Sequence, residues 1–375
     1  MKIGLPKEVM TGEERVALTP LACESLVRSG HTVYLQRGAG DGSGYSDHEY
    51  ERCGVLPVDS AQALYDAALL IIKVKQPLQQ DILHLRSDHV LFCYLHLAAD
   101  LQLIKTLCDI GLTAIPFESV RDENDHLPLL APMSQVAGRI AVIRGASLLF
   151  RNRGGRGVLL GGVDGTDPGR VTVIGAGVAG RNAVADACAL GARVDVLDLD
   201  EAKLAELKAR FPMINTHIST DELVESLCVD ADLVVGAVLR AGRRAPVVLK
   251  QSVIKKMNPG SVIIDIAIDQ GGCVEDIRST SSEELCYTFN GVIHSAVPNM
   301  PAAVARTSSQ SLSSAILPYV EALAVKTLAV KSPVAKIGSH SLQSVLVEAT
   351  AIYQGDIVDQ VLKQECSAAD ADSTG

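Results

Sequence analysis

Three polar residues stand at the ends of otherwise apolar segments, and a fourth lies in a loop after the first such segment; their side chains suit proton transfer beside a bound anion. Lys75 closes "LLIIKVK", His96 closes "HVLFCYLH" and Asp269 closes "SVIIDIAID". An imidazole titrates near neutral pH and can exchange protons, while an ammonium can stabilise a developing oxyanion. Arg15 follows "TGEE" after the first apolar segment, and a guanidinium can clamp a carboxylate with two parallel hydrogen bonds.

Each of these residues also has a simpler interpretation. A lone histidine in an apolar strand is more often a hydrogen-bonded core residue than a catalyst. Strand-end lysines and aspartates are commonly solvated, and Arg15 can form a surface ion pair with Glu13 or Glu14. In open α/β sheets, however, ligands lie beyond the carboxyl ends of strands. Several polar residues at such ends favour a functional site.

A second pattern, residues 171–200, predicts dinucleotide binding. "VTVIGAGVAGRNAVADACALGARVDVLDLD" contains a strand, the glycines Gly175, Gly177 and Gly180, a helix, a second strand and then Asp198. The three glycines allow a tight turn, approach of a pyrophosphate, and close packing of helix on strand. Asp198 is placed to accept hydrogen bonds from a ribose diol and repels a 2′-phosphate, so we expect NAD rather than NADP. Arg193 begins the second strand and is poorly placed to favour NADP.

The elements that must position these residues alternate along the chain. Strand-like and helix-like segments follow one another twice, which predicts parallel βαβ units. We expect an α/β protein with two Rossmann-like domains, each with a parallel sheet, separated by an interdomain cleft. The substrate domain is predicted at 1–128 plus 304–375, and the NAD-binding domain at 129–303. Residues 300–325 read as a return helix, the region to about 365 as amphipathic helix, and the polar tail as disordered.

Composition excludes several classes of protein. The chain has 375 residues, of which 47% are hydrophobic and only 3% aromatic, and its formal net charge is −10. That charge argues against bulk binding to nucleic acid or to anionic lipid. Nine scattered cysteines without a CxxC pair disfavour a disulfide framework or a zinc cluster. No apolar run reaches transmembrane length, so we expect a soluble cytoplasmic protein.

Longer blocks resemble a known family. "GEERVALTP", "KVKQP", "LFCYLHLAA", "LLAPMSQVAGR", "GGRGVLLGG", "VIGAGVAG", "DIAIDQGGC" and "VPNMP" occur in the order found in L-alanine dehydrogenases, from residue 1 to about 325. More distantly, the architecture resembles the NAD-binding subunit of transhydrogenase. The resemblance implies NAD-dependent deamination of L-alanine to pyruvate and ammonium by a homohexamer. Dehydrogenation of another small L-amino acid, or a transhydrogenase-like NAD(H)-binding module, remains the alternative.

The resemblance also implies roles for individual residues. Arg15 would hold the substrate carboxylate, Lys75 would bond its carboxylate or keto oxygen, His96 would be the general acid/base, and Asp269 would assist proton transfer. The implied cofactor-binding residues are Ser134, Gly175, Gly177, Val178, Ala179, Gly180, Asp198, Lys203, Thr220, Val238, Leu239, Ala267, Ile268, Asp269, Gln270, Arg278, Val297, Pro298, Asn299 and Met300. Gln76 and Gln135 stand where the family often has Glu. The return helix lacks the histidine of a metal site described in some members, so no metal is expected.

Overall fold

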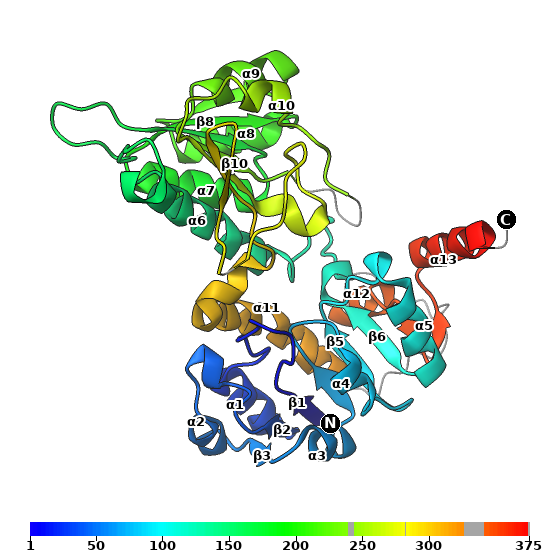
Figure 1. Cartoon of the computed structure of the whole chain (residues 1–375). Coiled ribbons are helices and arrows are strands. Elements are labelled where there is room, and N and C mark those ends of the chain that lie inside the picture. The colour runs from blue at the N-terminus through cyan, green and yellow to red at the C-terminus, as the bar shows by residue number, and fades with distance from the viewer. Residues whose placement is uncertain (239–243, 282, 326–340, 374–375) are drawn as a thin grey trace. The chain divides into compact units, whose positions relative to one another are not determined.

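The chain folds into two compact units. The structure is a computed structural model that describes residues 1–238, 244–281, 283–325 and 341–373. Unit 1 comprises Met1–Met133 and Ala302–Gly375, and unit 2 comprises Ser134–Pro301 (Figure 1). Each unit has its own sheet and its own core, so each is described by itself.

Unit 1 is built on an eight-stranded sheet in the order β15-β14-β6-β5-β4-β1-β2-β3. β1 to β6 pair in parallel, and β14 and β15 add an antiparallel edge. The strands are β1 (Lys2–Leu5), β2 (Thr32–Gln36), β3 (Leu56–Val58), β4 (Leu70–Ile72), β5 (Val90–Cys93), β6 (Thr113–Pro116), β14 (Ile352–Tyr353) and β15 (Asp356–Ile357).

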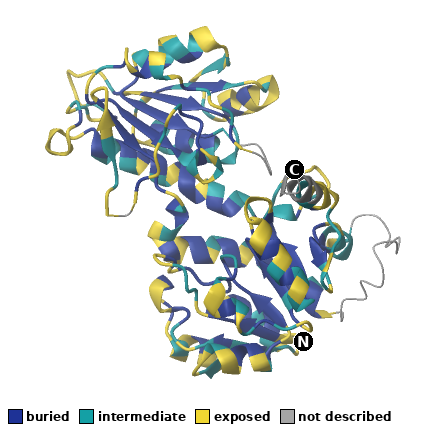
Figure 2. Cartoon of the chain, turned by 45° about the vertical axis from the view of Figure 1, so that its right-hand side comes forward, coloured by how far each residue is buried: buried dark blue, intermediate teal, exposed yellow. Residues whose placement is uncertain are grey.

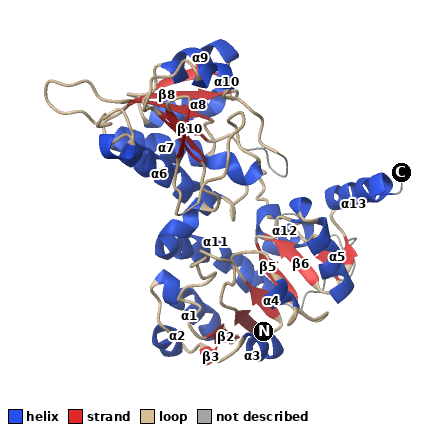
Figure 3. Ribbon diagram, viewed as in Figure 1, coloured by secondary structure: helices blue, strands red, loops and turns tan. Residues whose placement is uncertain are grey.

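Helices cover the faces of this sheet (Figure 3). The α-helices are α1 (Pro20–Arg28), α2 (Asp47–Arg52), α3 (Ala61–Ala67), α4 (Gln79–Ile82), α5 (Leu101–Ile110), α11 (Ala305–Val325), α12 (Leu342–Glu348) and α13 (Gln360–Ser373). Short 3-10 helices are η1 (Asp41–Ser43), η2 (Leu97–Ala99) and η3 (Phe117–Ser119). Local sequence sets several helix ends: Ser46 and Glu49 form a capping box at α2, and Gly111 ends α5 with a φ of 84°.

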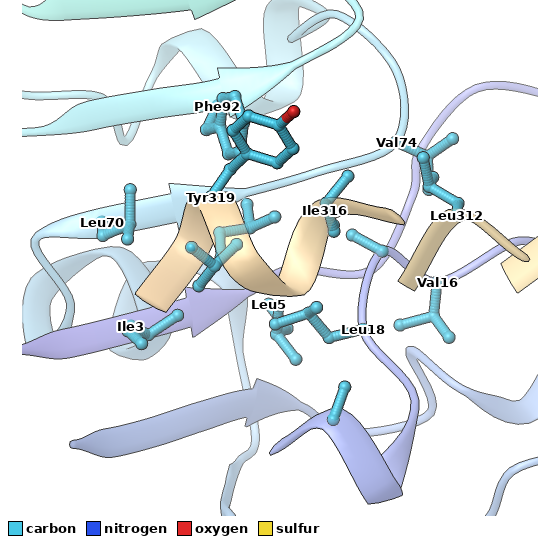
Figure 4. Packing of buried hydrophobic residues seen from close by; sticks show 14 of the residues in the cluster. Ile3, Leu5, Val16, Leu18, Leu70, Val74, Phe92, Leu312, Ile316 and Tyr319 are labelled. Atoms are coloured by element: carbon cyan, nitrogen blue, oxygen red, sulfur yellow. The ribbon is translucent and has the colours of Figure 1, made fainter. Parts of the chain in front are cut away.

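The return helix α11 completes the core of unit 1. Leu312, Ile316 and Tyr319 of α11 belong to the same buried cluster as Ile3 and Leu5 of β1 (Figure 4). Burial of both faces explains why the central strands are almost entirely apolar, since parallel sheets are covered on both sides. Figure 2 shows the same layering, with buried strands inside and exposed helix faces outside.

Unit 2 carries a seven-stranded sheet in the order β12-β13-β11-β10-β7-β8-β9, parallel except for β12. Its strands are β7 (Arg170–Ile174), β8 (Arg193–Asp198), β9 (Asn215–Ile218), β10 (Leu233–Gly236), β11 (Val262–Asp265), β12 (Tyr287–Phe289) and β13 (Val292–Ser295). Its helices are α7 (Val178–Ala189), α8 (Glu201–Arg210), α9 (Asp221–Val229), α10 (Gln251–Ile254), η4 (Arg151–Arg153) and η5 (Ile266–Gln270). α6 (Ala131–Leu148) and η6 (Met300–Val304) lie at the two unit boundaries.

The two mostly parallel sheets confirm the predicted fold class, while several details differ. β4 ends at Ile72, β5 at Cys93 and β11 at Asp265, each before the polar residue expected to close the strand. The amphipathic helix expected to about residue 365 is wrong for the described part, which contains α12, β14, β15 and α13. The tail expected to be disordered belongs to α13 as far as Ser373. In the described ranges, no helix combines the length and apolarity needed to cross a membrane.

Candidate active site

Three candidate residues of unit 1 follow neighbouring parallel strands. β1, β4 and β5 lie side by side in the sheet. Arg15 lies in the loop after β1, Lys75 in the turn after β4, and His96 in the turn after β5. The carboxyl ends of parallel strands meet at one edge, where ligands bind in open α/β sheets. The structure therefore places all three segments at the edge that the sequence predicts.

Arg15 is buried, with only 2% of its surface exposed. Its Nε donates to Oε1 of Glu13 at 2.7 Å, and its Nη2 pairs with Oε2 of the same carboxylate. Nη1 lies 2.9 Å from the Sδ of Met133. The ion pair considered for Arg15 thus exists, but it is buried rather than on the surface. A guanidinium has five N–H groups, so a pair with Glu13 is compatible with further bonds.

Two serines of α11 hold the loop that carries Arg15. The backbone N–H of Val16 donates to Oγ of Ser309 at 3.0 Å, and that of Thr19 donates to Oγ of Ser313 at 3.0 Å. Residues four apart lie on the same face of a helix, so one face of α11 receives both bonds. The sequence gives no direct signal of this contact, because the partners are almost 300 positions apart.

The lysine buried at the end of β4 is Lys73. Its exposed fraction is 1%, and its Nζ lies 3.3 Å from Oε2 of Glu8 and 3.2 Å from Oδ1 of Asp81. Burial acts to lower the pKa of Lys73, but the two carboxylates outweigh it, and the pKa is raised. Lys73 is therefore a charged residue of the core. Lys75 is half-buried in the turn that follows.

The two carboxylates around Lys73 also hold the turn that carries Lys75. Oε1 of Glu8 accepts the backbone N–H of Val74 at 2.7 Å, and Oδ2 of Asp81 accepts that of Leu78 at 3.0 Å. Tyr65 donates its hydroxyl to Oδ1 of Asp81 at 2.9 Å. Burial raises the pKa of Glu8, although Lys73 and the bond from Val74 oppose that shift. The turn is thus bonded on both sides of Lys75.

His96 is exposed, so the interpretation as a core histidine is wrong. Its backbone is left-handed, with φ 50° and ψ 39°, and it precedes η2. This conformation costs a non-glycine residue about 1–3 kcal/mol, and residues strained in this way cluster at functional sites. The ring of His96 stacks on that of Tyr94, with centroids 6.2 Å apart and planes 12° from parallel. The backbone N–H of His96 donates to Oε1 of Glu118 at 2.5 Å.

The glycine-rich turn of unit 2 joins β7 to α7. Gly175 has a φ of 104°, a conformation that favours glycine, and a Cβ at Gly180 would lie 1.7 Å from the carbonyl oxygen of Gly175. Around Gly177, by contrast, no atom lies within 4 Å of a Cβ position. Within the described chain, no side chain caps α7 at Gly177. A helix start with open N–H groups and no Cβ in front of it fits a pyrophosphate.

Asp198 lies at the end of β8, beside this turn. Its Oδ2 accepts the backbone N–H of Ala176 at 2.5 Å, and its Oδ1 accepts that of Asp200 at 2.9 Å. Each carboxylate oxygen has two lone pairs, so these bonds leave capacity for ribose hydroxyls. Arg193 lies at the opposite end of β8 and pairs with Asp167 at 2.7 Å. This placement agrees with the expectation that Arg193 does not serve a 2′-phosphate.

α6 packs closely on the start of α7. A Cβ at Gly138 would lie 2.1 Å from the carbonyl oxygen of Ala179, so the two helices touch at this glycine. Ser134 lies one turn earlier on α6 and is half-buried. Residues four apart share a face, so Ser134 and Gly138 lie along the same side of α6. The first turn of α7 contains Val178 and Ala179.

Other residues expected to bind the cofactor have local structural contacts. Lys203 is exposed on α8, and its Nζ lies 3.2 Å from Oδ2 of Asp200. Thr220 caps α9, its Oγ1 accepting the backbone N–H of Leu223 at 3.2 Å. Val238 is half-buried just after β10, and Leu239 lies outside the described residues. Helix capping and a surface ion pair are enough to explain Thr220 and Lys203 as they stand.

Asp269 lies in η5 rather than at a strand end, and its side chain is exposed. Its Oδ2 accepts the backbone N–H of Asn299 at 3.2 Å. The strand ends instead at Asp265, which is fully buried and accepts the N–H groups of Ala267 and Cys273, each at 2.8 Å. Burial raises the pKa of Asp265, while these hydrogen bonds oppose the shift. Asp265 thus fixes both ends of the segment that carries Asp269.

The rest of this edge of unit 2 comes from η5 and from the loops after β11 and β13. Arg278 places its guanidinium 4.2 Å from the ring centroid of Tyr287, which stacks on His294. Oε1 of Gln270 is buried without a hydrogen-bond partner in the described structure, which leaves an acceptor for a ligand. The remaining candidates differ in exposure: Ala267, Val297 and Met300 are buried, Ile268 and Asn299 half-buried, and Pro298 exposed.

The fold and the glycine-rich turn define a two-unit α/β protein of the dinucleotide-binding class. Comparison with models of protein families identifies the family within this class. Residues 4–137 match the model described as "Alanine dehydrogenase/PNT, N-terminal domain", and residues 141–360 match "Alanine dehydrogenase/PNT, C-terminal domain". This chain belongs to the alanine dehydrogenase/PNT family.

Relatives and solved structures agree with this family. Alanine dehydrogenase of Halomonas elongata is 47% identical over 327 residues, 87% of this chain and 88% of that protein. A solved L-alanine dehydrogenase is 40% identical with a TM-score of 0.92, covering 98% of this chain and 99% of the other. A transhydrogenase from Sinorhizobium meliloti is 25% identical with a TM-score of 0.83, covering 96% and 100%.

Sequence reasoning missed the carboxylates that support these segments. Glu8, Asp81, Glu118 and Asp265 each bond a segment that carries a candidate residue. Only Asp265 has a visible signal, as a carboxylate within the apolar run "SVIIDIAID". The others lie in ordinary polar stretches of sequence, and their structural role depends on hydrogen-bond partners that lie in other parts of the chain.

Proposed function

We propose that this protein is an NAD-dependent L-alanine dehydrogenase, which catalyses the reversible oxidative deamination of L-alanine to pyruvate and ammonium. The observation that carries the proposal is that Arg15, Lys75 and His96 follow three adjacent strands of unit 1. A carboxylate-binding cation, a second cation and an acid/base group are what an amino-acid substrate requires. A protein that only passes hydride between nucleotides has no need of these three groups.

NAD is the cofactor that the turn of unit 2 fits best. Gly177 and the uncapped start of α7 suit the pyrophosphate, and Asp198 suits a ribose diol. The further cofactor residues inferred from the family are Ser134, Lys203, Thr220, Val238, Leu239 and Arg278, with the segments 267–270 and 297–300. When bound, NAD accepts the hydride that leaves the α-carbon of L-alanine.

The chain's own residues then carry out the remaining steps. Arg15 binds the substrate carboxylate, and Lys75 donates a hydrogen bond to that carboxylate or to the oxygen formed on water addition. Loss of the hydride leaves an imine at the α-carbon, and His96 removes a proton from the water that adds to it. His96 then gives this proton to the amino group of the carbinolamine and takes the hydroxyl proton as ammonia leaves and the keto group forms, a role that suits an exposed imidazole. Asp269 orients the water and assists these proton transfers. The buried Glu8–Lys73–Asp81 cluster keeps the Lys75 turn in place.

The test is the oxidation of NADH with pyruvate plus ammonium, beside other small keto acids. We expect turnover with pyruvate, and a loss of kcat of about 10²–10⁴-fold in His96→Ala, the usual contribution of a positioned acid/base. His48→Ala is the matched control, because His48 is an exposed histidine on α2 of the same unit. That variant keeps the wild-type rate.

Other outcomes would select the alternatives. Faster turnover of another keto acid would keep the mechanism and change the substrate to a different small L-amino acid. Tight NADH binding without turnover of any keto acid would replace the proposal with a transhydrogenase-like NAD(H)-binding module.

We also propose a homohexamer, as the family resemblance suggests, and a location in the cytoplasm, where a reducing environment suits the scattered cysteines. Large apolar side chains of unit 2 are exposed, among them Ile143 at 62% and Leu159 at 56%, which supports association. Light scattering after gel filtration should give six times the 39.6 kDa mass of one chain. A monomer at micromolar concentration would contradict the hexamer without affecting the proposed reaction.

A further inference from the structure

The backbone of His96 is held by one carboxylate. Leu95 and His96 are consecutive, and both donate their backbone N–H groups to Glu118: Leu95 at 3.2 and 3.3 Å from the two oxygens, and His96 at 2.5 Å from Oε1. Consecutive N–H groups that converge on an anion are the arrangement of backbone nests. Here the anion is a side chain of the protein itself, and the residue at the bend is left-handed.

The segment that carries Glu118 is held by strand pairing and aromatic packing. It lies in η3, directly after β6, and β6 pairs in parallel with β5. Phe117 packs edge-on against Phe92 of β5, with centroids 4.5 Å apart, and against Tyr94, with centroids 5.0 Å apart. The carboxylate and the bend that it holds therefore come from adjacent strand ends joined by an aromatic cluster.

The imidazole of His96 is also restrained by Tyr94, which belongs to the same aromatic cluster. It stacks on the ring of Tyr94, whose hydroxyl donates to the carbonyl oxygen of Leu129 at 2.5 Å. Glu118 fixes where the backbone of His96 turns, and Tyr94 fixes the plane of the ring. Together they set the direction in which the imidazole nitrogens point.

We propose that Glu118 is a positioning residue for the reaction: its carboxylate holds the left-handed bend at His96 and so places the imidazole for proton transfer. The proposal rests on the proposed function, in which His96 is the acid/base group. Glu118 acts through backbone N–H groups and touches no reacting atom in this assignment. Its simplest alternative is a carboxylate that only stabilises the fold of unit 1.

The test uses Glu118→Gln in the full-length protein. A glutamine keeps the size of the side chain, but it carries no negative charge and its NH₂ group cannot accept the bond that Leu95 donates to the second carboxylate oxygen. Both N–H groups must then share one neutral oxygen. We expect kcat with pyruvate and ammonium to fall on the order of 100-fold, the loss associated with a small misplacement of a catalytic group. The affinity for NADH stays within twofold of wild type, since the dinucleotide turn belongs to unit 2.

Two comparisons separate positioning from stability. Glu49→Gln removes another carboxylate that accepts a backbone N–H in unit 1, that of Ser46 at 2.8 Å, and should leave kcat unchanged. The double variant His96→Ala/Glu118→Gln should be no slower than His96→Ala alone, because a residue that acts through His96 has nothing left to position. If Glu118→Gln does not fold, Glu118→Asp takes its place in the same cycle.

Amide hydrogen exchange gives a readout that is independent of turnover. In Glu118→Gln we expect exchange at the amides of Leu95 and His96 to speed up at least tenfold, with no such change in Glu49→Gln. Unchanged exchange, a Glu118→Gln kcat within threefold of wild type, or losses that multiply in the double variant would each overturn the role of Glu118. An inactive wild type, or a fully active His96→Ala, would instead count against the proposed function, and the exchange result would still decide whether Glu118 holds the bend.

Discussion

Two lysines only two positions apart have different surroundings. Lys73 is buried between Glu8 and Asp81, while Lys75 is half-buried in the next turn. A buried ammonium is tolerated because both carboxylates pair with it, and the same carboxylates accept backbone N–H groups on either side of Lys75. One lysine therefore supports the position that the other occupies.

Substitution of these lysines should separate stability from catalysis. Lys73→Met leaves two buried carboxylates without their cation, and we expect the free energy of unfolding to fall by about 3–5 kcal/mol. Lys75→Met should leave that free energy within about 0.5 kcal/mol and lower kcat/KM by about 10²–10³-fold. Urea denaturation and steady-state kinetics of the same preparations measure both quantities. Equal stability losses in the two variants would contradict this division.

The Lys73 variant should also respond to pH. Burial raises the pKa of Glu8 and Lys73 opposes that shift, so without Lys73 we expect Glu8 to bind a proton more readily in the folded state. As the pH falls, protonation of Glu8 in the folded state offsets part of the free energy of unfolding that Lys73→Met has lost. The stability difference from wild type should therefore be smaller at pH 5.5 than at pH 8. A stability difference that grows toward acid pH would show that a buried, ionised carboxylate is not the cause of the destabilisation.

At the scale of elements, the turn between β7 and α7 shows two different uses of glycine. Gly180 lies where a Cβ would meet the carbonyl oxygen of Gly175, whereas Gly177 faces open space and has a φ of −67° that alanine also adopts. The first glycine serves the packing of helix on strand. The second serves the approach of a ligand.

Alanine at each glycine should therefore give opposite results. Gly177→Ala should leave the stability of the unliganded protein unchanged, or raise it by up to about 1 kcal/mol, while weakening NADH binding at least tenfold because a methyl group meets the pyrophosphate. Gly180→Ala should destabilise unit 2 by more than 1 kcal/mol through overpacking. Isothermal titration with NADH and thermal unfolding decide between them. Unchanged NADH affinity in Gly177→Ala would sink the assignment of this turn.

At the scale of the whole molecule, each unit buries one of its described histidines in a medium of low dielectric constant. His89 of unit 1 is 1% exposed and His294 of unit 2 is 2% exposed. Burial lowers the pKa of both below the ordinary value of 6.5, although hydrogen bonds to backbone carbonyls oppose it. At a pH below this value the unfolded chain binds protons that the folded chain does not.

The protein should consequently lose stability as the pH falls through about 6.5. With more protons bound to the unfolded state, the free energy of unfolding decreases toward acid pH, by at most about 1.4 kcal/mol per pH unit for each histidine. His294→Phe should reduce this slope between pH 7.5 and 5.5, measured by urea denaturation. An unchanged slope would mean that His294 takes up its proton in the folded state.

Local patterns predicted the sheets and the dinucleotide turn, because periodicity and glycine spacing act within one segment. No sequence pattern singles out Lys73, because the apolar segment predicts a strand that reaches Lys75, whereas β4 stops at Ile72. Glu118 had no signal, because its partners are N–H groups of another strand end. The prediction of helix after α11 is wrong for the same reason. Ile352 of β14 pairs with Ala114 of β6, and no local sequence pattern encodes a pairing between such distant residues.

That pairing has a consequence for synthesis on the ribosome. Unit 2 is one continuous stretch, Ser134–Pro301, so all of its strands emerge before translation reaches α11. The first six strands of unit 1 are synthesised before unit 2. Unit 1 is completed only after unit 2, when α11, which covers β1, and β14, which pairs with β6, have been synthesised. The unit made first in the order of translation is thus the last to be completed. Until then its apolar face is the surface that a chaperone would find on the nascent chain.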